Sequence, residues 1–520
     1  MSSANVQMLI GLGVYMAVMI SIGLWYSRKG NTNPEDYFLA KRRFGPWLTS
    51  MSAQASDMSG WLLMGLPGVA FFLGVGEAFW TALGLFIGTW VNWGLVAKRL
   101  RSYSQIANNA ITLPEFFSKR FHDNKRILLA IAASISLLFF SFYVGSQLLV
   151  VGKLFNSLFG LNMLIMVIVS AIVVLSYTLI GGFLAVGITD LIQALIMVIA
   201  LVFIFIFGFF YAGGISGITE NLQNFPGFLD FFGVANPIMV ANADGGMSQQ
   251  VIGGVAQFSS TGTSFGFIAI ISIMAWGLGY FGMPHVLVRF MAVNKISNIR
   301  KSRIIAVTWC FIAQFAAVCI GLIGRAIYRG DFGDSESIFI VMSQSFFPPL
   351  FAGLIISGIL AASMSSSDSY LLIVSSSFAN DIYKGIVKKN ASEKTVMLIA
   401  RITMLVVSVL AIFVALNFEK SIFRVVAFAW AGLGASFGPL VLFSLFWKRT
   451  TFPAAVAGMI SGGVMVLFWR LVVRPNFLDL YELLPAFILS CLVIFLVSLV
   501  TKKPSEAIEA EFDKAKAAEL

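Results

Sequence analysis

One short polar segment interrupts an apolar stretch near the start of the chain. It runs from Ala55 to Gly68 and contains Asp57, Ser59, Gly60 and Pro67. A carboxylate in the interior of a bilayer costs about 2.5–3.5 kcal/mol, so it is usually retained for function. Glycine and proline can break a helix, and broken backbone is tolerated at membrane depth only where protein or a water-filled cavity surrounds it. The segment therefore predicts an ion or solute site in a discontinuous transmembrane helix.

A second polar cluster lies within the apolar stretch 343–385, where five serines and one aspartate occur in seven residues. Ala362, Ser365, Ser366 and Ser369 recur at helical spacing, so they share one helix face. Hard cations prefer oxygen ligands, which hydroxyls and freed backbone carbonyls supply without excess charge. This face is typical of a sodium site. The alternative is that the serines bond carbonyls of their own helix or connect neighbouring helices.

Three acids lie deep in apolar stretches, namely Asp57, Asp190 and Asp368. A buried carboxylate needs a cation or a proton. Asp368 lies about 60° around the helix from Ser365, so it could supply a second cation site together with Asp190 and Ser369. For each acid the alternative is a neutral, hydrogen-bonded carboxylic acid.

Aromatic residues surround a third irregular segment. Trp276 and Tyr280 flank a glycine-rich break, and with Tyr143 and Trp61 they could wall a small cavity. Aromatic walls suit a small amphipathic solute, and the face of a tryptophan attracts a cationic amine. The alternative, ordinary core or lipid-facing aromatics, holds for most of the 50 phenylalanines. His285 is expected to be a satisfied core or boundary histidine.

Composition places these segments in a polytopic membrane protein. The chain has 520 residues, of which 58% are hydrophobic and 11% charged, against about 25% charged in a soluble domain. The three cysteines lie in apolar stretches and predict no disulfide framework. No Walker A sequence, Cys/His metal spacing or nucleophile–base pair is present, so neither an enzyme nor ATP-driven transport is predicted.

Runs of about 20 apolar residues predict thirteen transmembrane helices, which puts the two termini on opposite sides of the membrane. The predicted spans are 5–26, 46–72, 76–98, 126–156, 160–181, 184–212, 263–292, 301–327, 343–385, 394–416, 420–447, 452–473 and 482–501. The net charge of +11 comes from Lys and Arg clustered in loops on one side, whereas 213–262 has none. The basic side is predicted to be cytoplasmic, with the N-terminus outside, the C-terminus inside and no nucleic-acid partner. The tail 502–520 is predicted to be a short, mobile helix or coil.

The two interrupted spans, 46–72 and 263–292, are five helices apart and start on opposite sides of the membrane. This arrangement predicts an inverted five-helix repeat, although glycine and proline are also common in ordinary membrane helices. The predicted organisation is an extra helix and cytoplasmic loop (1–45), a first repeat (46–212), an extracellular loop (213–262), a second repeat (263–447), and two extra helices with a cytoplasmic tail (448–520).

With these features the chain resembles the sodium:solute symporter family, and within it the bacterial sodium/proline branch. The resemblance runs from about residue 5 to residue 500. It rests on the segments Ala55–Gly68, Leu113-Pro114-Glu115, Gly181–Val186, Trp276–Gly282, Trp430-Ala431-Gly432 and Phe437-Gly438-Pro439. It implies an all-α fold of thirteen helices, built on the inverted five-helix repeat of the leucine transporter.

The resemblance also implies a main sodium site. Its ligands would be the backbone oxygens of Ala55, Met58 and Ala362 and the hydroxyls of Ser365 and Ser366. The acid needed for sodium coupling would be Asp57. Some family members hold a second sodium ion further toward the cytoplasm, where Asp190, Ser365, Asp368 and Ser369 fall in this chain.

For the solute, the resemblance implies a site beside the broken helix, with aromatic lining. The residues it implies are Ser59, Gly60, Trp61, Tyr143, Trp276, Gly279, Tyr280 and Met283. One position departs from the proline branch, which often has glutamine where this chain has Met283. That change removes a polar group near the expected cavity and leaves the solute less sharply defined.

These features together predict symport of Na⁺ and L-proline by alternating access. We expect a multi-pass protein of the cell membrane that functions as a monomer. A sodium-coupled carrier of another small solute, such as another amino acid, a betaine, a sugar or an organic acid, would keep the same fold. A channel or a membrane sensor is the alternative from a different class, but polar groups fall only near the bilayer centre and give no continuous path.

Overall fold

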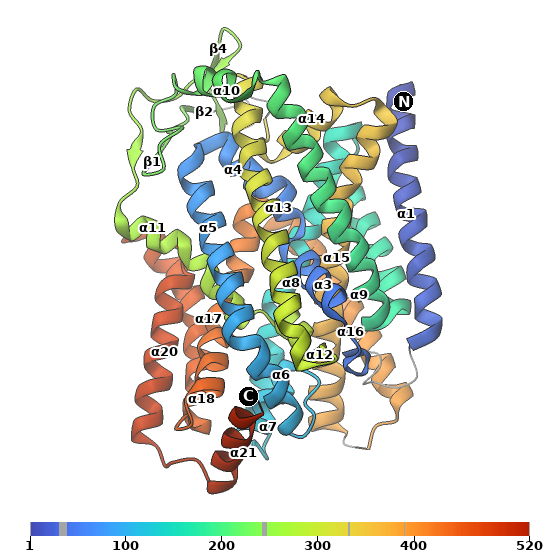
Figure 1. The fold of residues 1–520 in the computed structure, drawn as a ribbon, viewed down its shortest axis with the longest axis vertical. Helices are drawn as coiled ribbons and strands as arrows, with labels where there is room; N and C mark the ends of the chain where they lie inside the picture. The colour runs from blue at the N-terminus through green and yellow to red at the C-terminus, as the bar shows by residue number, and fades with distance from the viewer. Residues whose placement is uncertain (1, 31–38, 242–246, 331–332, 389, 519–520) are drawn as a thin grey trace.

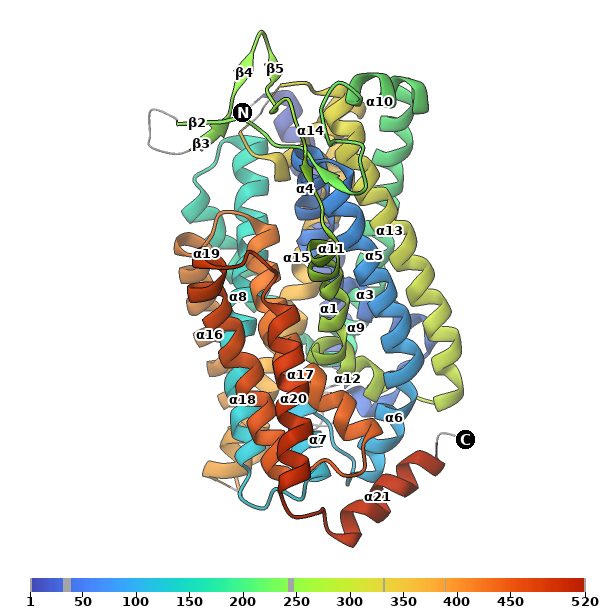
Figure 2. The same cartoon turned by 90° about the vertical axis from the view of Figure 1, so that its left-hand side faces the viewer.

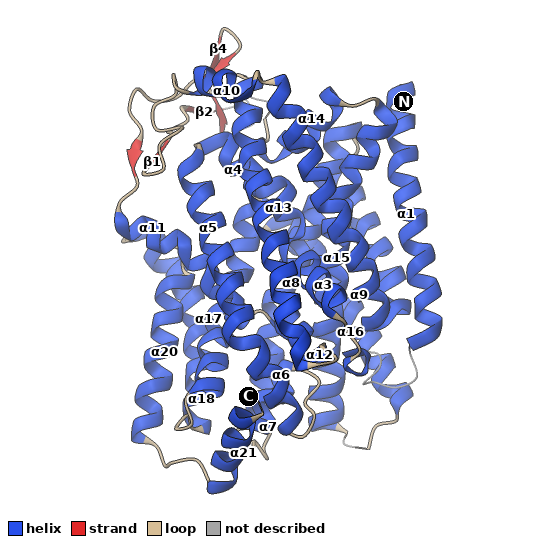
Figure 3. Ribbon diagram, in the orientation of Figure 1, coloured by secondary structure: helices blue, strands red, loops and turns tan. Residues whose placement is uncertain are grey.

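A computed structural model describes residues 2–30, 39–241, 247–330, 333–388 and 390–518. Most of the long helices run roughly along its longest axis, and the short strands gather at one end (Figures 1 and 3). The N-terminus lies toward the end that carries the strands, whereas the C-terminus lies toward the opposite end (Figure 2).

The first half of the chain contains two interrupted helices among otherwise continuous ones. The elements are α1 (Ser3–Gly30), η1 (Ala40–Arg42), α3 (Pro46–Gly60), η2 (Trp61–Gly65), α4 (Leu66–Leu73), α5 (Val75–Val91), η3 (Asn92–Val96), α6 (Ala97–Ile106), α7 (Leu113–Arg120), α8 (Ile127–Phe159) and α9 (Met163–Tyr211). The interruptions are at Ser59 and at Gly182, each with positive φ.

The connecting segment after α9 holds α10 (Gly214–Leu222) and six short strands. The strands are β1 (Gly233–Val234), β2 (Met239–Ala241), β3 (Met247–Gln249), β4 (Val251–Ile252), β5 (Val255–Ala256) and β6 (Thr263–Ser264). They form three antiparallel pairs, β1–β6, β2–β3 and β4–β5. The sequence predicted a loop here and did not anticipate these pairs, because strands of two or three residues carry little periodic signal.

The second half repeats the pattern of long helices around one broken helix. Its elements are α11 (Phe267–Met274), η4 (Ala275–Gly282), α12 (Pro284–Ala292), η5 (Ile296–Asn298), α13 (Ile299–Ile327), η6 (Ser335–Ser337), α14 (Ile338–Phe346), α15 (Pro349–Ser376), η7 (Ser377–Val387), α16 (Glu393–Asn417), α17 (Ile422–Phe446), α18 (Phe452–Phe468), η8 (Trp469–Val473), α19 (Arg474–Asn476), α20 (Leu483–Val500) and α21 (Glu506–Ala517).

Within the described residues, eleven helices are long and apolar enough to span a membrane, and the count rises to twelve if the bent pair 267–282 and 284–292 is one span. The predicted span 160–181 corresponds to the part of α9 before Gly182, in which Met163–Ser176 is an apolar helix. Gly182, with φ of 66° and ψ of 174°, is not helical, so it divides α9 into two helical parts at this point. Length and composition of the described residues thus give eleven or twelve spans and do not confirm the predicted number of thirteen.

Two predicted segments differ from the structure in instructive ways. The span expected at 343–385 begins inside α14, and a separate helix starts after Pro348 because consecutive prolines cannot continue a helix. The tail forms α21 as a helix, but its Phe512 is buried against Tyr103 of α6, at a ring-centroid distance of 6.2 Å. The tail therefore packs on the bundle, whereas the sequence analysis expected a mobile segment.

The broken helix and its partners form the centre of the bundle. The most apolar stretch of α17 is 94% buried, that of 46–73 is 83% buried and that of 349–387 is 78% buried. The corresponding stretches of α1 and α20 are only 28% and 33% buried. The outer helices carry exposed large apolar side chains, such as Val14 and Leu496. This outward apolar surface suits lipid. The polar segments predicted from the sequence thus lie at the protein centre.

Candidate functional site

The break in the first interrupted helix is at Ser59, as predicted. Its backbone has φ of 53° and ψ of −174°, which a non-glycine residue adopts only at a cost of about 1–3 kcal/mol. The break frees backbone groups that an unbroken helix would pair. The amide of Gly60 donates to the Gln147 side-chain oxygen at 3.0 Å, and the amide of Trp61 donates to Ser59 Oγ at 3.2 Å. Polar backbone is therefore available at the centre of the bundle.

The second break separates η4 from α12 and bends the chain by 44°. Met283 is extended at this point, and Pro284 begins α12. Glycines let neighbouring backbones approach closely: a Cβ on Gly277 would lie 2.2 Å from the Gly84 carbonyl oxygen, and one on Gly282 would lie 2.6 Å from the Gly438 nitrogen. The glycine-rich run thus allows η4 to pack directly on α5 and α17.

The serine face of α15 contacts the backbone just before the first break. Ser365 Oγ donates to the carbonyl oxygens of Ala55, at 2.8 Å, and Ala362, at 3.1 Å. Ser366 Oγ lies 3.4 Å from the same Ala55 oxygen. The structure thus brings together four of the five predicted sodium ligands, while the carbonyl of the fifth, Met58, accepts the amide of Trp61. Hydroxyls can rotate to present lone pairs to a cation, so these oxygens can serve as ligands.

Asp57 points to the second broken helix and not to the serine face. Its Oδ2 accepts a hydrogen bond from the Tyr280 hydroxyl at 2.7 Å, and its Oδ1 lies 3.6 Å from His285 Nε2. His285 is fully buried, but neither ring nitrogen makes a hydrogen bond within the described part of the chain. His285 is thus a core histidine, as expected, but its ring is not satisfied by hydrogen bonds among the described residues. Asp57 connects the two broken helices. It lies in α3, two residues after Ala55, and it accepts a hydrogen bond from Tyr280 of η4.

A small cavity lies beside the first break. It is lined by Asp57, Met58, Ser59, Trp61, Leu85, Tyr143, Trp276, Tyr280, Val426 and Trp430. Five predicted solute-site residues are in this lining, and so are the predicted sodium ligand Met58 and the coupling acid Asp57. Half of the lining residues are aromatic and one is a carboxylate, a composition suited to a small amphipathic solute that carries a positive charge.

Three predicted solute-site residues lie behind this wall. A Cβ on Gly279 would lie 1.9 Å from Trp430 Nε1, so Gly279 allows the indole to pack on η4. A Cβ on Gly60 would lie 2.5 Å from Val150 Cγ2, which makes Gly60 a close-packing position on α8. Met283 is fully buried and does not belong to the cavity lining. The departure from the proline branch at Met283 is therefore outside the lining.

The residues predicted for a second sodium ion meet around an arginine. Arg289 Nη2 lies 3.0 Å from Asp190 Oδ2 and donates to Ser369 Oγ at 2.6 Å. Ser52 Oγ donates to the same Asp190 oxygen at 2.7 Å. Ser369 Oγ lies 3.4 Å from Asp368 Oδ1. Three of the four predicted residues, Asp190, Asp368 and Ser369, thus come together with Ser52, but a guanidinium lies among them; the fourth, Ser365, contacts Ala55 and Ala362 instead.

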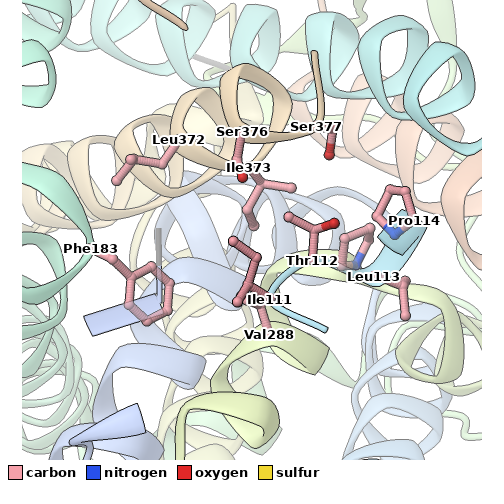
Figure 4. A pocket seen from close by; sticks show the side chains of 11 residues that line it. Ile111, Thr112, Leu113, Pro114, Phe183, Val288, Leu372, Ile373, Ser376 and Ser377 are labelled. Atoms are coloured by element: carbon pink, nitrogen blue, oxygen red, sulfur yellow. The ribbon is translucent and has the colours of Figure 1, made fainter. Parts of the chain in front are cut away.

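A second cavity lies beside the start of α7. Its lining is Ile111, Thr112, Leu113, Pro114, Phe183, Pro284, Val288, Leu372, Ile373, Ser376 and Ser377, and Figure 4 shows the hydroxyls of Thr112, Ser376 and Ser377 among apolar side chains. Below it, Thr112 Oγ1 donates to Asp381 Oδ2 at 2.8 Å. The sequence analysis missed this cavity because its walls come from four separate regions of the chain.

Aromatic rings separate the two cavities. Tyr143, which lines the first cavity, stacks on Tyr370 with ring centroids 4.4 Å apart. Tyr370 in turn contacts the ring of His285 at 4.9 Å and that of Phe140 at 5.2 Å. Pro284, beside His285, lines the second cavity. The Tyr370 hydroxyl donates to the Ser56 carbonyl at 2.8 Å, so this cluster is attached to the broken helix.

Comparison with known proteins gives the family. The sequence model of the sodium:solute symporter family matches residues 37–462, which is most of the chain. The chain belongs to the sodium:solute symporter family.

Characterised relatives of this symporter match it over nearly the full length. The sodium/proline symporter of Salmonella typhimurium is 41% identical over 99% of this chain and 97% of its own. The osmoregulated proline transporter OpuE of Bacillus subtilis is 40% identical over 97% of this chain and 96% of its own. The sodium/proline symporter of Escherichia coli is 40% identical over 99% of this chain and 97% of its own.

A solved structure shares the fold of this symporter. It is the substrate-bound, outward-open state of a Na⁺-coupled sialic acid symporter, with a TM-score of 0.76 at 20% identity. The match covers 97% of this chain and 99% of that one. The fold is thus that of a membrane transporter built from many helices.

Three residues of this symporter's site were not predicted from the sequence. Gln147 holds the freed amide of Gly60, Trp430 closes the aromatic wall, and Arg289 binds Asp190. A signal existed for two of them, because Gln147 and Arg289 are polar residues inside predicted spans. The sequence analysis considered acids in the spans and did not consider the arginine or the amide. Trp430 lay in a recognised motif but carried no predicted role.

Proposed function

We propose that this symporter couples inward movement of sodium to uptake of L-proline by alternating access. The observation that carries the proposal is the contact between the serine face of α15 and the Ala55 carbonyl, beside an aromatic cavity that contains Asp57. Relatives about 40% identical over nearly the whole chain are named as proline transporters, which supports the choice of solute.

Sodium is proposed to bind between the two central helices. Its ligands are the carbonyl oxygens of Ala55, Met58 and Ala362 and the hydroxyls of Ser365 and Ser366. All five oxygens are neutral, so a desolvated sodium ion gains ligands without a fixed opposite charge. The ion would replace the present hydroxyl-to-carbonyl contacts and hold the first break against α15. That connection gives sodium a direct effect on the helix that faces the solute.

The solute is proposed to bind in the aromatic cavity beside the first break. Its carboxylate faces the freed backbone at Ser59, which lines the cavity, since broken-helix amides suit anionic groups. Its amine faces Asp57 and the aromatic surface of Trp276, and its apolar ring packs on Tyr143. Asp57 thereby joins solute binding to the sodium site two residues away. Met283 lies outside the lining, so its difference from the proline branch does not disfavour proline.

The architecture that goes with this function is thirteen spans with an inverted repeat. We assign 46–212 and 263–447 to the two repeats, 1–45 and 448–520 to the flanking parts, and 213–262 to the outside. The strand-bearing end then faces outward and the end with α7 and α21 faces the cytoplasm, following the basic loops. The cavity beside α7 would lie on the route of release. A monomer contains the whole site, and each sodium ion that crosses 100 mV inward contributes about 2.3 kcal/mol.

The test is uptake of labelled L-proline by the purified protein in proteoliposomes. We expect accumulation that follows an imposed sodium gradient and is unaffected by a proton gradient of equal size. Uptake that follows the proton gradient alone would refute sodium coupling. Competition by unlabelled amino acids, betaines, sugars and organic acids then tests the identity of the solute. If one of these compounds inhibits the uptake of labelled proline at a much lower concentration than unlabelled proline does, that compound and not proline is the preferred substrate.

A further inference from the structure

Arg289 is the centre of a buried polar cluster one helical turn from the proposed sodium site. Its Nε donates to Ser52 Oγ at 3.0 Å, and its Nη1 donates to the His285 carbonyl at 2.8 Å. Its Nη2 contacts Asp190 Oδ2 at 3.0 Å and Ser369 Oγ at 2.6 Å. Each nitrogen of the guanidinium therefore has a partner, and the side chain is fully buried.

The cluster joins four elements of the bundle centre. Ser52 belongs to α3, Asp190 to α9, Arg289 to α12 and Ser369 to α15. A guanidinium stays protonated in proteins, so it keeps a full positive charge here. Removing one member of such a buried pair leaves the other charge without compensation. Asp190 therefore requires a cation at this place, and Arg289 supplies it.

Without the guanidinium, the same oxygens would suit a sodium ion. The Asp190 carboxylate and the hydroxyls of Ser52 and Ser369 form an oxygen set with one negative charge, which is what a hard cation prefers. With Arg289 in place, its Nη2 occupies the contacts to both Asp190 and Ser369. A second ion would meet a like charge at contact distance and would lose two of its ligands. The residues present therefore do not fit a second sodium ion.

We propose that the guanidinium of Arg289 is a tethered cation that takes the place of a second sodium ion, so that this symporter moves one sodium ion per solute. The inference rests on the proposed function and concerns the number of ions in that same cycle. It also assigns a latent sodium site at Ser52, Asp190 and Ser369, which opens when the charge at position 289 is removed.

The decisive measurement balances two opposed gradients in proteoliposomes held at zero membrane voltage. Sodium is set tenfold higher outside, and labelled proline tenfold higher inside. One ion per solute makes these gradients cancel, so the wild type should show no net flux. With two ions per solute, the free energy released by sodium entry would be twice the free energy needed to move proline inward. Proline would then move inward.

Arg289→Gln is the variant that should open the latent site. We expect net inward proline flux under the same balanced gradients, and sodium activation that changes from hyperbolic to sigmoidal. Arg289→Lys keeps a positive charge and should stay balanced. Combining Arg289→Gln with Asp190→Asn removes both charges and should also return to one ion. Arg325→Gln removes another fully buried arginine, which donates to the Phe71 and Gly330 carbonyls, and should remain balanced.

Net inward flux in the wild type would overturn the proposal, whatever the variants do. An active Arg289→Gln protein that stays balanced and hyperbolic would overturn it as well. If Arg289→Gln is folded but does not transport, radioactive sodium binding to the purified protein decides: two ions per molecule, against one in the wild type, supports the proposal, and one ion in both refutes it. If Arg289→Gln does not fold, the wild-type flux alone decides. Wild-type uptake without any sodium dependence would instead refute the proposed function, so the two failures are distinguishable.

Discussion

Ser365→Ala tests the proposed sodium site most directly. The hydroxyl of Ser365 lies 2.8 Å from the Ala55 carbonyl and 3.1 Å from the Ala362 carbonyl, and the residue is fully buried. Alanine removes one of five proposed ligand oxygens and adds no bulk. The vacated volume is too small to disturb the helix contact, so the loss should fall on sodium.

The expected size follows from the cost of losing one partner of a charged group. A hydrogen bond to a charged group contributes about 1.5–3 kcal/mol, and one hydroxyl–sodium contact should be of the same order. That corresponds to a sodium constant raised about tenfold to about 150-fold. Because coupling between two ligands is reciprocal, the apparent proline affinity should also fall at low sodium and should recover when sodium is in excess.

The assay is the sodium dependence of labelled proline uptake in proteoliposomes, with protein amount measured in each preparation. Ser366→Ala should behave like Ser365→Ala, although its oxygen is more distant from Ala55, at 3.4 Å. Ser375→Ala is the matched control, since it lies on the same helix, is fully buried and donates to the Leu372 carbonyl of its own helix at 2.9 Å. The control should keep the wild-type sodium constant.

The reasoning fails if excess sodium does not restore proline affinity in Ser365→Ala, or if its sodium constant stays within twofold of the wild type. Either result would mean that the serine face connects α15 to α3 and does not bind the ion. A sodium constant raised equally in Ser375→Ala would point to general weakening of α15.

Two further substitutions test the solute cavity. Trp276→Ala removes an aromatic wall and should raise the apparent proline constant about fivefold to thirtyfold, the equivalent of about 1–2 kcal/mol, while sodium binding without solute changes little; wild-type proline kinetics would contradict this position of the cavity. Gly279→Ala places a Cβ 1.9 Å from Trp430 Nε1 and should abolish uptake, while Gly13→Ala, with open space at its Cβ, should not. Normal uptake by membrane-inserted Gly279→Ala would show that the Trp430 wall can move freely.

Several parts of the site could be predicted from the sequence because they are local. Asp57, Ser59 and Gly60 within an apolar stretch predict a broken helix, and the break is at Ser59. The serines at 365, 366 and 369 share a helix face by spacing alone. Basic residues in short loops predict which end faces the cytoplasm. Each of these signals is contained in a few consecutive residues, where helical geometry and the cost of burying polar groups act directly.

Other features were decided only when distant segments met. Ser365 is 310 positions from Ala55, and Arg289 is 99 positions from Asp190. The periodicity within one helix does not show which other helix it will pack against. The sequence therefore indicated which oxygen-bearing residues could bind a cation, but not that Arg289 would contact them. The same reason hid the cavity shared by Thr112, Pro284 and Ser376.

The sequence by itself therefore determined the membrane-spanning class, the two broken helices, and the residue types proposed to bind an ion and a small solute. The tertiary structure decided which of those residues share a site. It placed Trp430, and not Met283, in the cavity lining. It also filled the predicted second cation position with Arg289, because a buried carboxylate takes the nearest positive charge that packing makes available.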